Sequence, residues 1–389
     1  MSAALGRSQA SSHRGLQGEG TPMNPCTTAA EAFRAPDLPL TFARRLIDWQ
    51  RQSGRSGLPW QGTRDPYRVW LSEVMLQQTQ VSTVLSYYPR FLARFPDVFA
   101  LAEAQADDVM ALWSGLGYYS RARNLHRCAQ VVVAQHGGLF PDSAQGLEAL
   151  PGIGASTAAA IAAFCHGERI SIVDGNVRRV LTRLMAMDAD LALASAQHEL
   201  WQRAQALLPE TPSTEDMTAY TQGLMDLGAT VCLRSRPLCG RCPVQDLCVA
   251  HAQGVPQNYP VKTRLLKRRH ESWWLLWLRG PATDASDRVW LERRPARGIW
   301  AGLYCLPVFD SEASLLEALP PHLRSGVRAL EPVSHSLTHR ELRLHPLLLE
   351  TSEAMAFAAD LGGQWVDEAA LAQYGLPAPV RLLLSRDLP

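Results

Sequence analysis

The stretch from Leu150 to Asn176 constrains the fold of this 389-residue chain more than any other feature. It opens with Leu-Pro-Gly-Ile-Gly at residues 150–154. Two glycines one residue apart after a proline predict a tight hairpin, because glycine adopts positive φ without Cβ strain. The alanine-rich segment Ser156–Phe164 then predicts a helix. A turn that feeds a helix N-terminus presents free N–H groups and the positive end of the helix dipole, which suits a phosphate. Taken alone, this pattern fits an ordinary helix connection equally well.

Asp174, near the end of that stretch, directly precedes a predicted helix, Gly175–Met187. It is therefore expected as the N-cap of that helix, and most aspartates in such a position do nothing more. The same N–H donors and helix dipole favour the ionised carboxylate by lowering its pKa.

A second carboxyl group, that of Glu73, lies on a helix predicted from Tyr67 to Gln78 that starts after Asp65-Pro66. Its helical neighbours are mostly apolar: Val69, Trp70, Leu76 and Gln77. Burial without a cation raises the pKa of a glutamate and favours the protonated acid. The simpler interpretation is a glutamate at the edge of the apolar stripe that reaches solvent. Two carboxyl groups with pKa values shifted in opposite directions are, however, suited to separate acid and base roles at neutral pH.

Four cysteines lie close together, at spacings of six, two and five intervening residues: Cys232, Cys239, Cys242 and Cys248. In a cytosolic chain such a cluster indicates metal binding rather than disulfides. A zinc ribbon would have two C-x2-C pairs, and this segment has one. Arginines between these cysteines predict a cationic outer face for the loop: Arg234, Arg236 and Arg241. The other cysteines are predicted to be incidental or buried thiols: Cys26, Cys128, Cys165 and Cys305.

The residues at 150–157 and 173–180, together with Ser72–Gln80 and the cysteine spacing, resemble the helix-hairpin-helix DNA glycosylases, and within these the adenine-specific MutY family. The resemblance is strong over residues 38–251 and weak from 271 onward. It implies a mostly α helix-hairpin-helix glycosylase domain with a [4Fe–4S] loop, followed by a C-terminal α+β Nudix-like domain. The expected divisions are a disordered tail (1–37), the glycosylase domain (38–255, cluster loop 232–248), a basic linker (256–270) and a lesion-recognition domain (271–389).

The resemblance also implies roles for individual residues. Glu73 would protonate the flipped adenine and Asp174 would stabilise the cation that forms on the sugar. Expected substrate contacts are Gln222, which would read the adenine edge, and Asn176, Trp60 and Ser156. Expected DNA and lesion contacts are Gln78, Thr79, an exposed wedge of Leu116 and Tyr118, and Gly152, Gly154, Thr338 and His339. Arg121, Arg123 and Arg127, just behind the wedge, are expected to contact phosphates. Where the family commonly has Phe-Ser-His, this chain has Leu337-Thr338-His339.

The C-terminal third changes to a strand pattern, and the stretch Gly298–Pro307 carries its resemblance to the Nudix-like domain. Strands are predicted at Ser272–Arg279, Arg288–Arg293, Leu303–Phe309 and Leu342–Glu350, with helices at Glu312–Leu319 and Asp367–Tyr374. The acidic metal-binding box of Nudix hydrolases is missing from the sequence, which argues against pyrophosphate hydrolysis.

The resemblance implies a monofunctional glycosylase that removes adenine opposite 8-oxoguanine or guanine in double-stranded DNA. A bifunctional glycosylase/lyase of the endonuclease III type needs an amine nucleophile, which would fall at Ser156. The only lysines of the chain are Lys262 and Lys267, so no lysine in the helical domain can form a Schiff base. A non-catalytic lesion-binding protein is the alternative from another class.

The net charge of +1 gives no global nucleic-acid signal, and no apolar run is long enough for a membrane span. A monomer in a bacterial cytoplasm, associated with the nucleoid, is expected.

Overall fold

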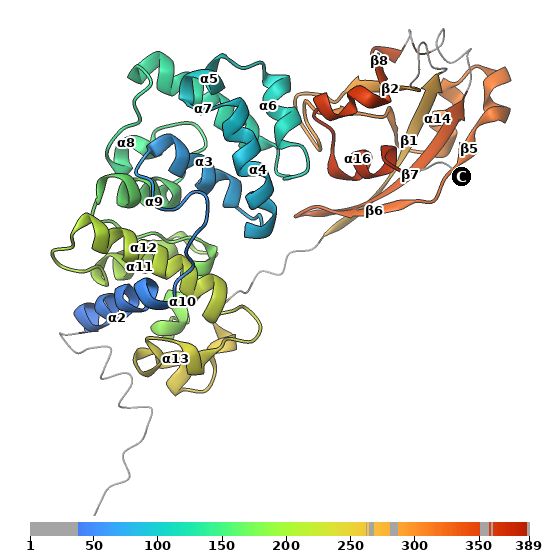
Figure 1. Cartoon of the computed structure of the whole chain (residues 1–389). Helices are drawn as coiled ribbons and strands as arrows, with labels where there is room; N and C mark the ends of the chain where they lie inside the picture. The colour runs from blue at the N-terminus through green and yellow to red at the C-terminus, as the bar shows by residue number, and fades with distance from the viewer. Residues whose placement is uncertain are drawn as a thin grey trace, which may run out of the picture.

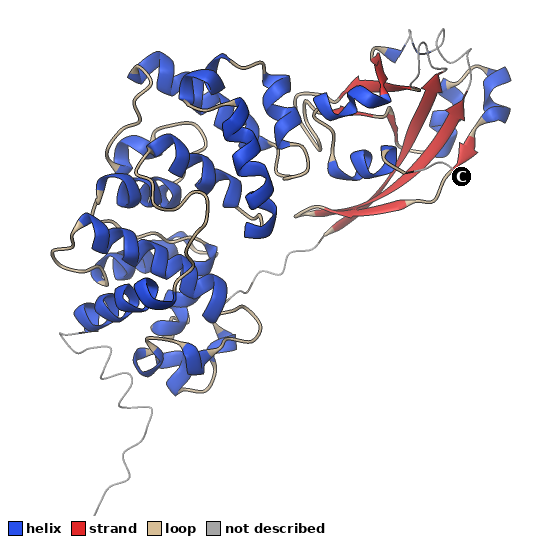
Figure 2. Ribbon diagram, viewed as in Figure 1, coloured by secondary structure: helices blue, strands red, loops and turns tan. Residues whose placement is uncertain are grey.

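The computed structural model describes residues 38–261, 263, 268–280, 287–350, 358 and 361–386. The chain forms a helical part followed by a smaller part built on a sheet (Figures 1 and 2). The predicted disordered tail, Cys26, and both lysines of the predicted linker lie outside the described residues. No helix in the described ranges is long and apolar enough to cross a membrane.

The helical part contains short helices joined by tight turns. They are α2 (Leu38–Ser53), α3 (Pro66–Leu76), α4 (Val81–Arg94), α5 (Val98–Glu103), α6 (Ala106–Trp113), α7 (Ser120–His136), α8 (Ala144–Glu148), α9 (Ala155–His166), α10 (Gly175–Leu184), α11 (Ala194–Ala206), α12 (Thr214–Asp226) and α13 (Val249–Ala252). A π-helical turn, Leu227–Val231, leads from α12 into the cysteine loop. Such turns are rare and often occur at functional sites.

The alanine-rich helix α9 separates two hydrophobic cores. Ala158, Ile161 and Ala162 belong to the core formed with α3–α8. Ala159, Ala160 and Ala163 belong to the core formed with α2 and α10–α12. Because methyl side chains are small, helices can approach α9 closely from both sides, and α3 and α12 both pack against it. Side chains that project from the helices of the two cores are thus separated by the width of α9.

The C-terminal part is a mixed sheet with the path β3-β2-β1-β7-β5 among the described residues. Its strands are β1 (Arg269–Gly280), β2 (Arg288–Arg293), β3 (Tyr304–Cys305), β4 (Val308–Phe309), β5 (Arg328–Ala329), β6 (Val333–Ser336), β7 (Arg340–Glu350) and β8 (Gln364–Asp367). The long strands β1 and β7 are parallel, in register from Arg269 opposite Arg340 to Arg279 opposite Glu350. Helices α14 (Glu312–Ala318) and α16 (Ala378–Leu384) accompany the sheet (Figure 1).

Most predicted elements are confirmed, and the errors have local causes. The predicted strand Leu303–Phe309 is wrong as a single strand, since Leu306-Pro307 divides it into β3 and β4. The sequence also predicts two short helices over Leu92–Trp113, split at Pro96. The chain does break there, but the region contains the end of α4 followed by α5 and α6. Helix α10 ends at Leu184, short of the predicted Met187, before Ala186 takes a left-handed conformation with φ of 46°. The predicted helix Asp367–Tyr374 is a 3-10 helix, Glu368–Gln373.

Candidate functional site

Glu73 projects from α3, a helix that begins as predicted with Asp65 accepting a hydrogen bond from the backbone N–H of Tyr67 at 2.9 Å. Its helical neighbours Val69 and Trp70 are buried. Glu73 itself is half-buried, and no described residue forms a hydrogen bond with its carboxyl group. Burial, and secondarily the charge of Asp174, raises the pKa of Glu73 to about 8. At neutral pH the group is therefore a protonated acid with its proton available to a ligand.

Asp174 is the N-cap of α10, as predicted. Its Oδ1 accepts the backbone N–H groups of Asn176 at 2.9 Å and Val177 at 2.7 Å. The residue before it is tied to α9, because the N–H of Val173 donates to Ser156 Oγ at 3.2 Å. The two carboxyl groups come from the two cores on either side of α9, and they lie near enough for the charge of Asp174 to act on Glu73.

Gln222 on α12 is oriented by a buried ion pair that the sequence did not reveal. Its Nε2 donates to Asp226 Oδ1 at 2.8 Å. Asp226 is fully buried and pairs with Arg55, whose Nε lies 2.7 Å from Oδ1 and whose backbone N–H lies 2.9 Å from Oδ2. Within the described chain the Oε1 of Gln222 has no donor, so it remains an acceptor for a ligand. The only feature of the sequence that could have indicated this contact is an acidic residue, Asp226, one helical turn after Gln222.

Asn176 is linked to the cysteine loop through Arg179. The guanidinium of Arg179 donates to Asn176 Oδ1 at 3.0 Å, to the carbonyl of Gly228 at 2.7 Å and to the carbonyl of Cys232 at 2.8 Å. A Cβ on Gly228 would lie 2.8 Å from Asn176 Cβ, so glycine is required for this close approach. One side chain thus joins the first turn of α10 to the first cysteine.

The hairpin before α9 has one glycine in the predicted conformation. Gly152 has φ of 78°, and a Cβ there would come within 2.6 Å of Asn124 Cβ. The prediction of positive φ is wrong for Gly154, which has φ of −92° as the N-cap of α9. A Cβ on Gly154 would meet no atom within 4 Å. The N–H groups of Gly154 and Ala155 have no acceptor among the described residues, which leaves them available to an anion.

The side chains predicted to contact the DNA around the lesion or the substrate differ in exposure: some are exposed and others are buried. Gln78 and Tyr118 are exposed and have positive φ, 55° and 50°, and non-glycine residues with this strain cluster at functional sites. The expectation of an exposed Leu116 is wrong: only 6% of its surface is accessible, because its side chain packs into the α3–α8 core. Trp60 is also largely buried, with its ring 5.5 Å from that of Tyr88.

Arg121 is a structural link between the two strained turns. Its guanidinium donates to the carbonyls of Val74 and Met75 in the last turn of α3, at 2.7 and 3.0 Å. It also donates to Thr79 Oγ1 at 3.0 Å and to the carbonyl of Gly117 at 3.3 Å. Burial lowers its pKa to about 10.

The prediction that three arginines behind the wedge contact phosphates is therefore wrong for Arg121 in this structure, since it is buried and its terminal nitrogens donate to the protein. Arg123 donates to the carbonyl of Ala301 at 2.7 Å but is exposed, so its contact with a phosphate stays a prediction. Arg127 is exposed.

Thr338 and His339 lie at the turn between β6 and β7, and both are exposed. The turn is closed by hydrogen bonds from the N–H of Leu337 to the carbonyl of Arg340 at 2.7 Å and from the N–H of Arg269 to the carbonyl of His339 at 3.0 Å. Their side chains are thus presented outward by a fixed backbone.

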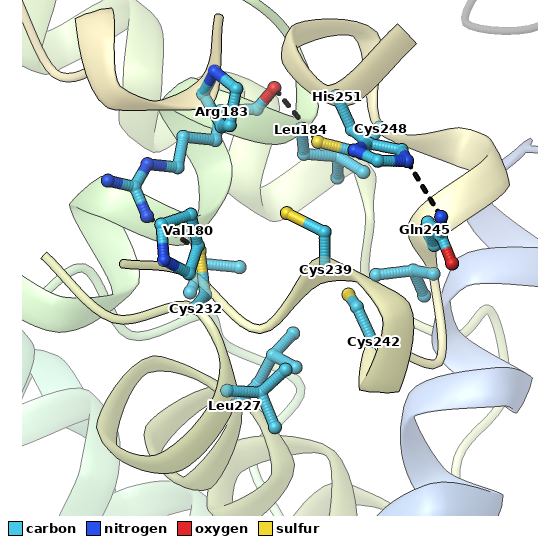
Figure 3. A pocket seen from close by; sticks show the side chains of 14 residues that line it. Val180, Arg183, Leu184, Leu227, Cys232, Cys239, Cys242, Gln245, Cys248 and His251 are labelled. Carbon is cyan, nitrogen blue, oxygen red and sulfur yellow. Dashed lines mark hydrogen bonds between the residues drawn. The ribbon is translucent and has the colours of Figure 1, made fainter. Parts of the chain in front are cut away.

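The four clustered cysteines surround one cavity, which Val180, Leu184 and Leu227 also line (Figure 3). None of the four forms a disulfide. Arg183, a buried residue, donates to Cys232 Sγ at 3.4 Å and to the carbonyl of Leu233 at 2.7 Å. The predicted cationic rim is confirmed in position, since Arg234, Arg236 and Arg241 are all exposed.

Four free thiols that line one cavity are a donor set that suits a metal ion or an iron–sulfur cluster. Burial raises the pKa of the thiols of Cys242 and Cys248 to about 12 and 11, so their ionisation requires compensating positive charge, as bound iron supplies.

The comparisons with known proteins agree with this arrangement. Residues 71–206 match the HhH-GPD superfamily of base excision DNA repair proteins, residues 232–248 the iron–sulfur binding domain of endonuclease III, and residues 282–386 the NUDIX domain. The loop is therefore a [4Fe–4S] binding loop.

Full-length relatives extend the match to most of the chain. An adenine DNA glycosylase of Buchnera aphidicola subsp. Baizongia pistaciae is 32% identical over 352 residues, 89% of this chain and 97% of the relative. The Mus musculus adenine DNA glycosylase is 35% identical over 84% of this chain and 73% of its own length. A solved thermostable thymine-DNA glycosylase covers 59% of this chain and 100% of its own, with 24% identity and a TM-score of 0.48. Since the full-length relatives share this identity over nearly the whole sequence, the chain belongs to the adenine DNA glycosylase family of base excision repair enzymes.

Proposed function

We propose that this enzyme hydrolyses the N-glycosidic bond of adenine mispaired with 8-oxoguanine or guanine in double-stranded DNA. The observation that carries the proposal is the pair of carboxyl groups, one protonated at neutral pH and one held at a helix N-terminus. The base is proposed to be adenine because the similar proteins are adenine DNA glycosylases. A monomer in the bacterial cytoplasm, associated with the nucleoid, belongs to the same proposal.

The reaction begins with adenine out of the base stack, where Glu73 gives its proton to N7. Protonation makes the base a better leaving group, and the glycosidic electron pair leaves with it. Positive charge then develops on the sugar, and Asp174 stabilises that cation until water adds. The free Oε1 of Gln222 accepts from the exocyclic amine of adenine, and Asn176, fixed by Arg179, supports the acid and the water. Ser156 positions the chain before Asp174.

DNA binding rests on separate contacts. The free N–H groups of Gly154 and Ala155 suit one phosphate, and the exposed arginines of the cysteine loop suit others. Gln78 and Tyr118 press into the duplex near the lesion, with Thr79 held beside them by Arg121. The [4Fe–4S] cluster, held by the four loop cysteines, supplies structural order to that loop.

We also propose that Thr338 and His339 read the 8-oxoguanine. The hydroxyl group of Thr338 can donate and accept hydrogen bonds, and both side chains are exposed at the β6–β7 turn. Leu337 keeps apolar contact without the aromatic ring that the family commonly has.

Replacing both residues, Thr338→Ala with His339→Ala, is expected to reduce the preference for 8-oxoguanine over guanine by about tenfold, since each lost hydrogen bond contributes about 0.5–1.5 kcal/mol. Single-turnover rates on the two duplexes measure the preference. Ser334→Ala, which removes an exposed hydroxyl on β6, is the control. An undiminished preference in the double variant would assign lesion reading to the helical part.

The proposed function is tested by single-turnover reactions on duplexes with adenine opposite 8-oxoguanine, adenine opposite guanine, and thymine glycol. The adenine strands should break only after alkali is added, because a hydrolytic glycosylase leaves an intact abasic site. The thymine glycol strand should stay whole. Breakage without alkali would favour the glycosylase/lyase alternative, and binding without any base release would favour the non-catalytic alternative.

A further inference from the structure

The turn Ser114–Tyr119, which carries the strained Tyr118, is fastened to the C-terminal part of the chain. The hydroxyl groups of Ser114 and Tyr119 both donate to the carbonyl of Leu376, at 2.6 and 3.0 Å. Ser114 is 1% exposed, Leu376 is 1% exposed, and the contacts are buried. One carbonyl oxygen of the C-terminal part therefore fixes both ends of this turn.

Further contacts join α6 to the C-terminal part of the chain. A Cβ on Gly375 would come within 2.9 Å of Met110 Cβ on α6, so the backbone approaches that helix as closely as only glycine allows. Asp107, one turn earlier, pairs with Arg293 at 2.8 Å and accepts from the hydroxyl of Tyr304 at 3.3 Å.

A second connection runs from the same surface toward the β6–β7 turn. Arg123 donates to the carbonyl of Ala301, and the neighbouring Trp300 has a left-handed backbone with φ of 57°. The ring of Trp300 lies 6.3 Å from that of His335 on β6, the strand that leads to Thr338. Strand β6, which leads to the turn proposed to read the lesion, is thus linked by this ring pair to the segment that Arg123 of α7 contacts.

Arg121 carries the connection onward to the catalytic acid. No described carboxylate pairs with it, and its two terminal nitrogens donate to the turn and to the last turn of α3, the helix that bears Glu73. Its guanidinium lies 5.3 Å from the ring centre of Tyr118. A shift of the turn would therefore displace hydrogen bonds at the end of the catalytic helix.

We propose that Ser114 and Tyr119 are positioning residues through which the C-terminal part holds the Tyr118 turn, so that adenine excision depends on the opposite base. The coupling rests on the proposed function, since it concerns the same mispair. It adds a route by which the C-terminal part, which would read the 8-oxoguanine, affects the excision of adenine by the helical part.

The test compares single-turnover rates on adenine opposite 8-oxoguanine and adenine opposite guanine, using the full chain with its cluster. Ser114→Ala with Tyr119→Phe removes both donors and keeps the ring. The control is Tyr220→Phe, which removes a buried hydroxyl that donates to the carbonyl of Leu207 at 3.2 Å. We expect the ratio of the two rates to fall about tenfold in the double variant, within the 5- to 150-fold range typical of coupled sites, and to stay at the parental value in the control.

Gly375→Ala perturbs the interface from the other side. Gly326→Ala is its control, because a Cβ there would only make ordinary contact, at 3.4 Å, with a side-chain methyl. Gly375→Ala should lower the rate ratio and speed hydrogen exchange over residues 107–123, whereas Gly326→Ala should do neither.

A parental ratio in both the double variant and Gly375→Ala would overturn the coupling, as would an equal loss of both rates, which indicates a purely structural role. Failure of the parent enzyme to release adenine would instead refute the proposed function. The two failures are therefore distinguishable.

Discussion

Replacing Glu73 by glutamine is expected to abolish adenine excision while leaving duplex binding intact. The amide keeps the shape of the side chain but has no acidic proton, and general acid catalysis contributes roughly 10²–10⁴-fold in rate. Because no described residue hydrogen-bonds the Glu73 carboxyl, the substitution leaves no protein partner unsatisfied. Single-turnover excision and duplex affinity, measured on the same preparation, separate the two effects.

A matched control is Glu215→Gln, which changes an exposed glutamate in the first turn of α12. It should excise adenine at the parental rate. Excision by Glu73→Gln within a few-fold of the parent would assign the proton donor to another residue.

Substitution of a cluster ligand is expected to have an equally large effect, on folding rather than on chemistry. Replacing Cys239 or Cys242 by serine removes a thiolate from a cavity in which all four sulfurs are needed, and cluster binding is coupled to folding. The purified variants should lack brown colour, contain little iron and be poorly soluble. Because Arg179 and Arg183 attach α10 to this loop, its loss should also disturb Asp174.

Cys128→Ala is the control for the cluster substitution, since Cys128 is a fully buried thiol of the other core. It should retain colour and iron. Zinc in place of iron in anaerobically purified parent protein would contradict the cluster assignment.

Local sequence signals predicted the parts of the site that depend on neighbours in the chain. Asp65 and Asp174 were identified as N-caps because capping is decided within three residues. The raised pKa of Glu73 followed from apolar neighbours one helical turn away. Metal binding by the cysteine loop followed from the clustering of its cysteines, and the iron–sulfur cluster followed from the resemblance to the glycosylase family.

The errors concern residues whose environment comes from distant segments. Leu116 looked like an exposed wedge, but its side chain packs into the α3–α8 core, whose shape depends on several helices. Arg121 looked like a phosphate ligand, although it is buried and donates to the carbonyls of Val74 and Met75. Arg55 and Asp226 are 171 positions apart in the sequence, and no periodic pattern of residues predicts a contact over that separation.

The pH dependence of single-turnover adenine release from the 8-oxoguanine duplex tests the central claim most directly. A general acid acts only when protonated, so a pKa of about 8 for Glu73 predicts a rate that is retained at neutral pH and falls as the pH rises through that value. The same profile in Glu73→Gln should be flat and close to zero. A parental rate that stays constant from neutral pH to well above 8, or a Glu73→Gln variant that keeps the parental profile, would contradict the account.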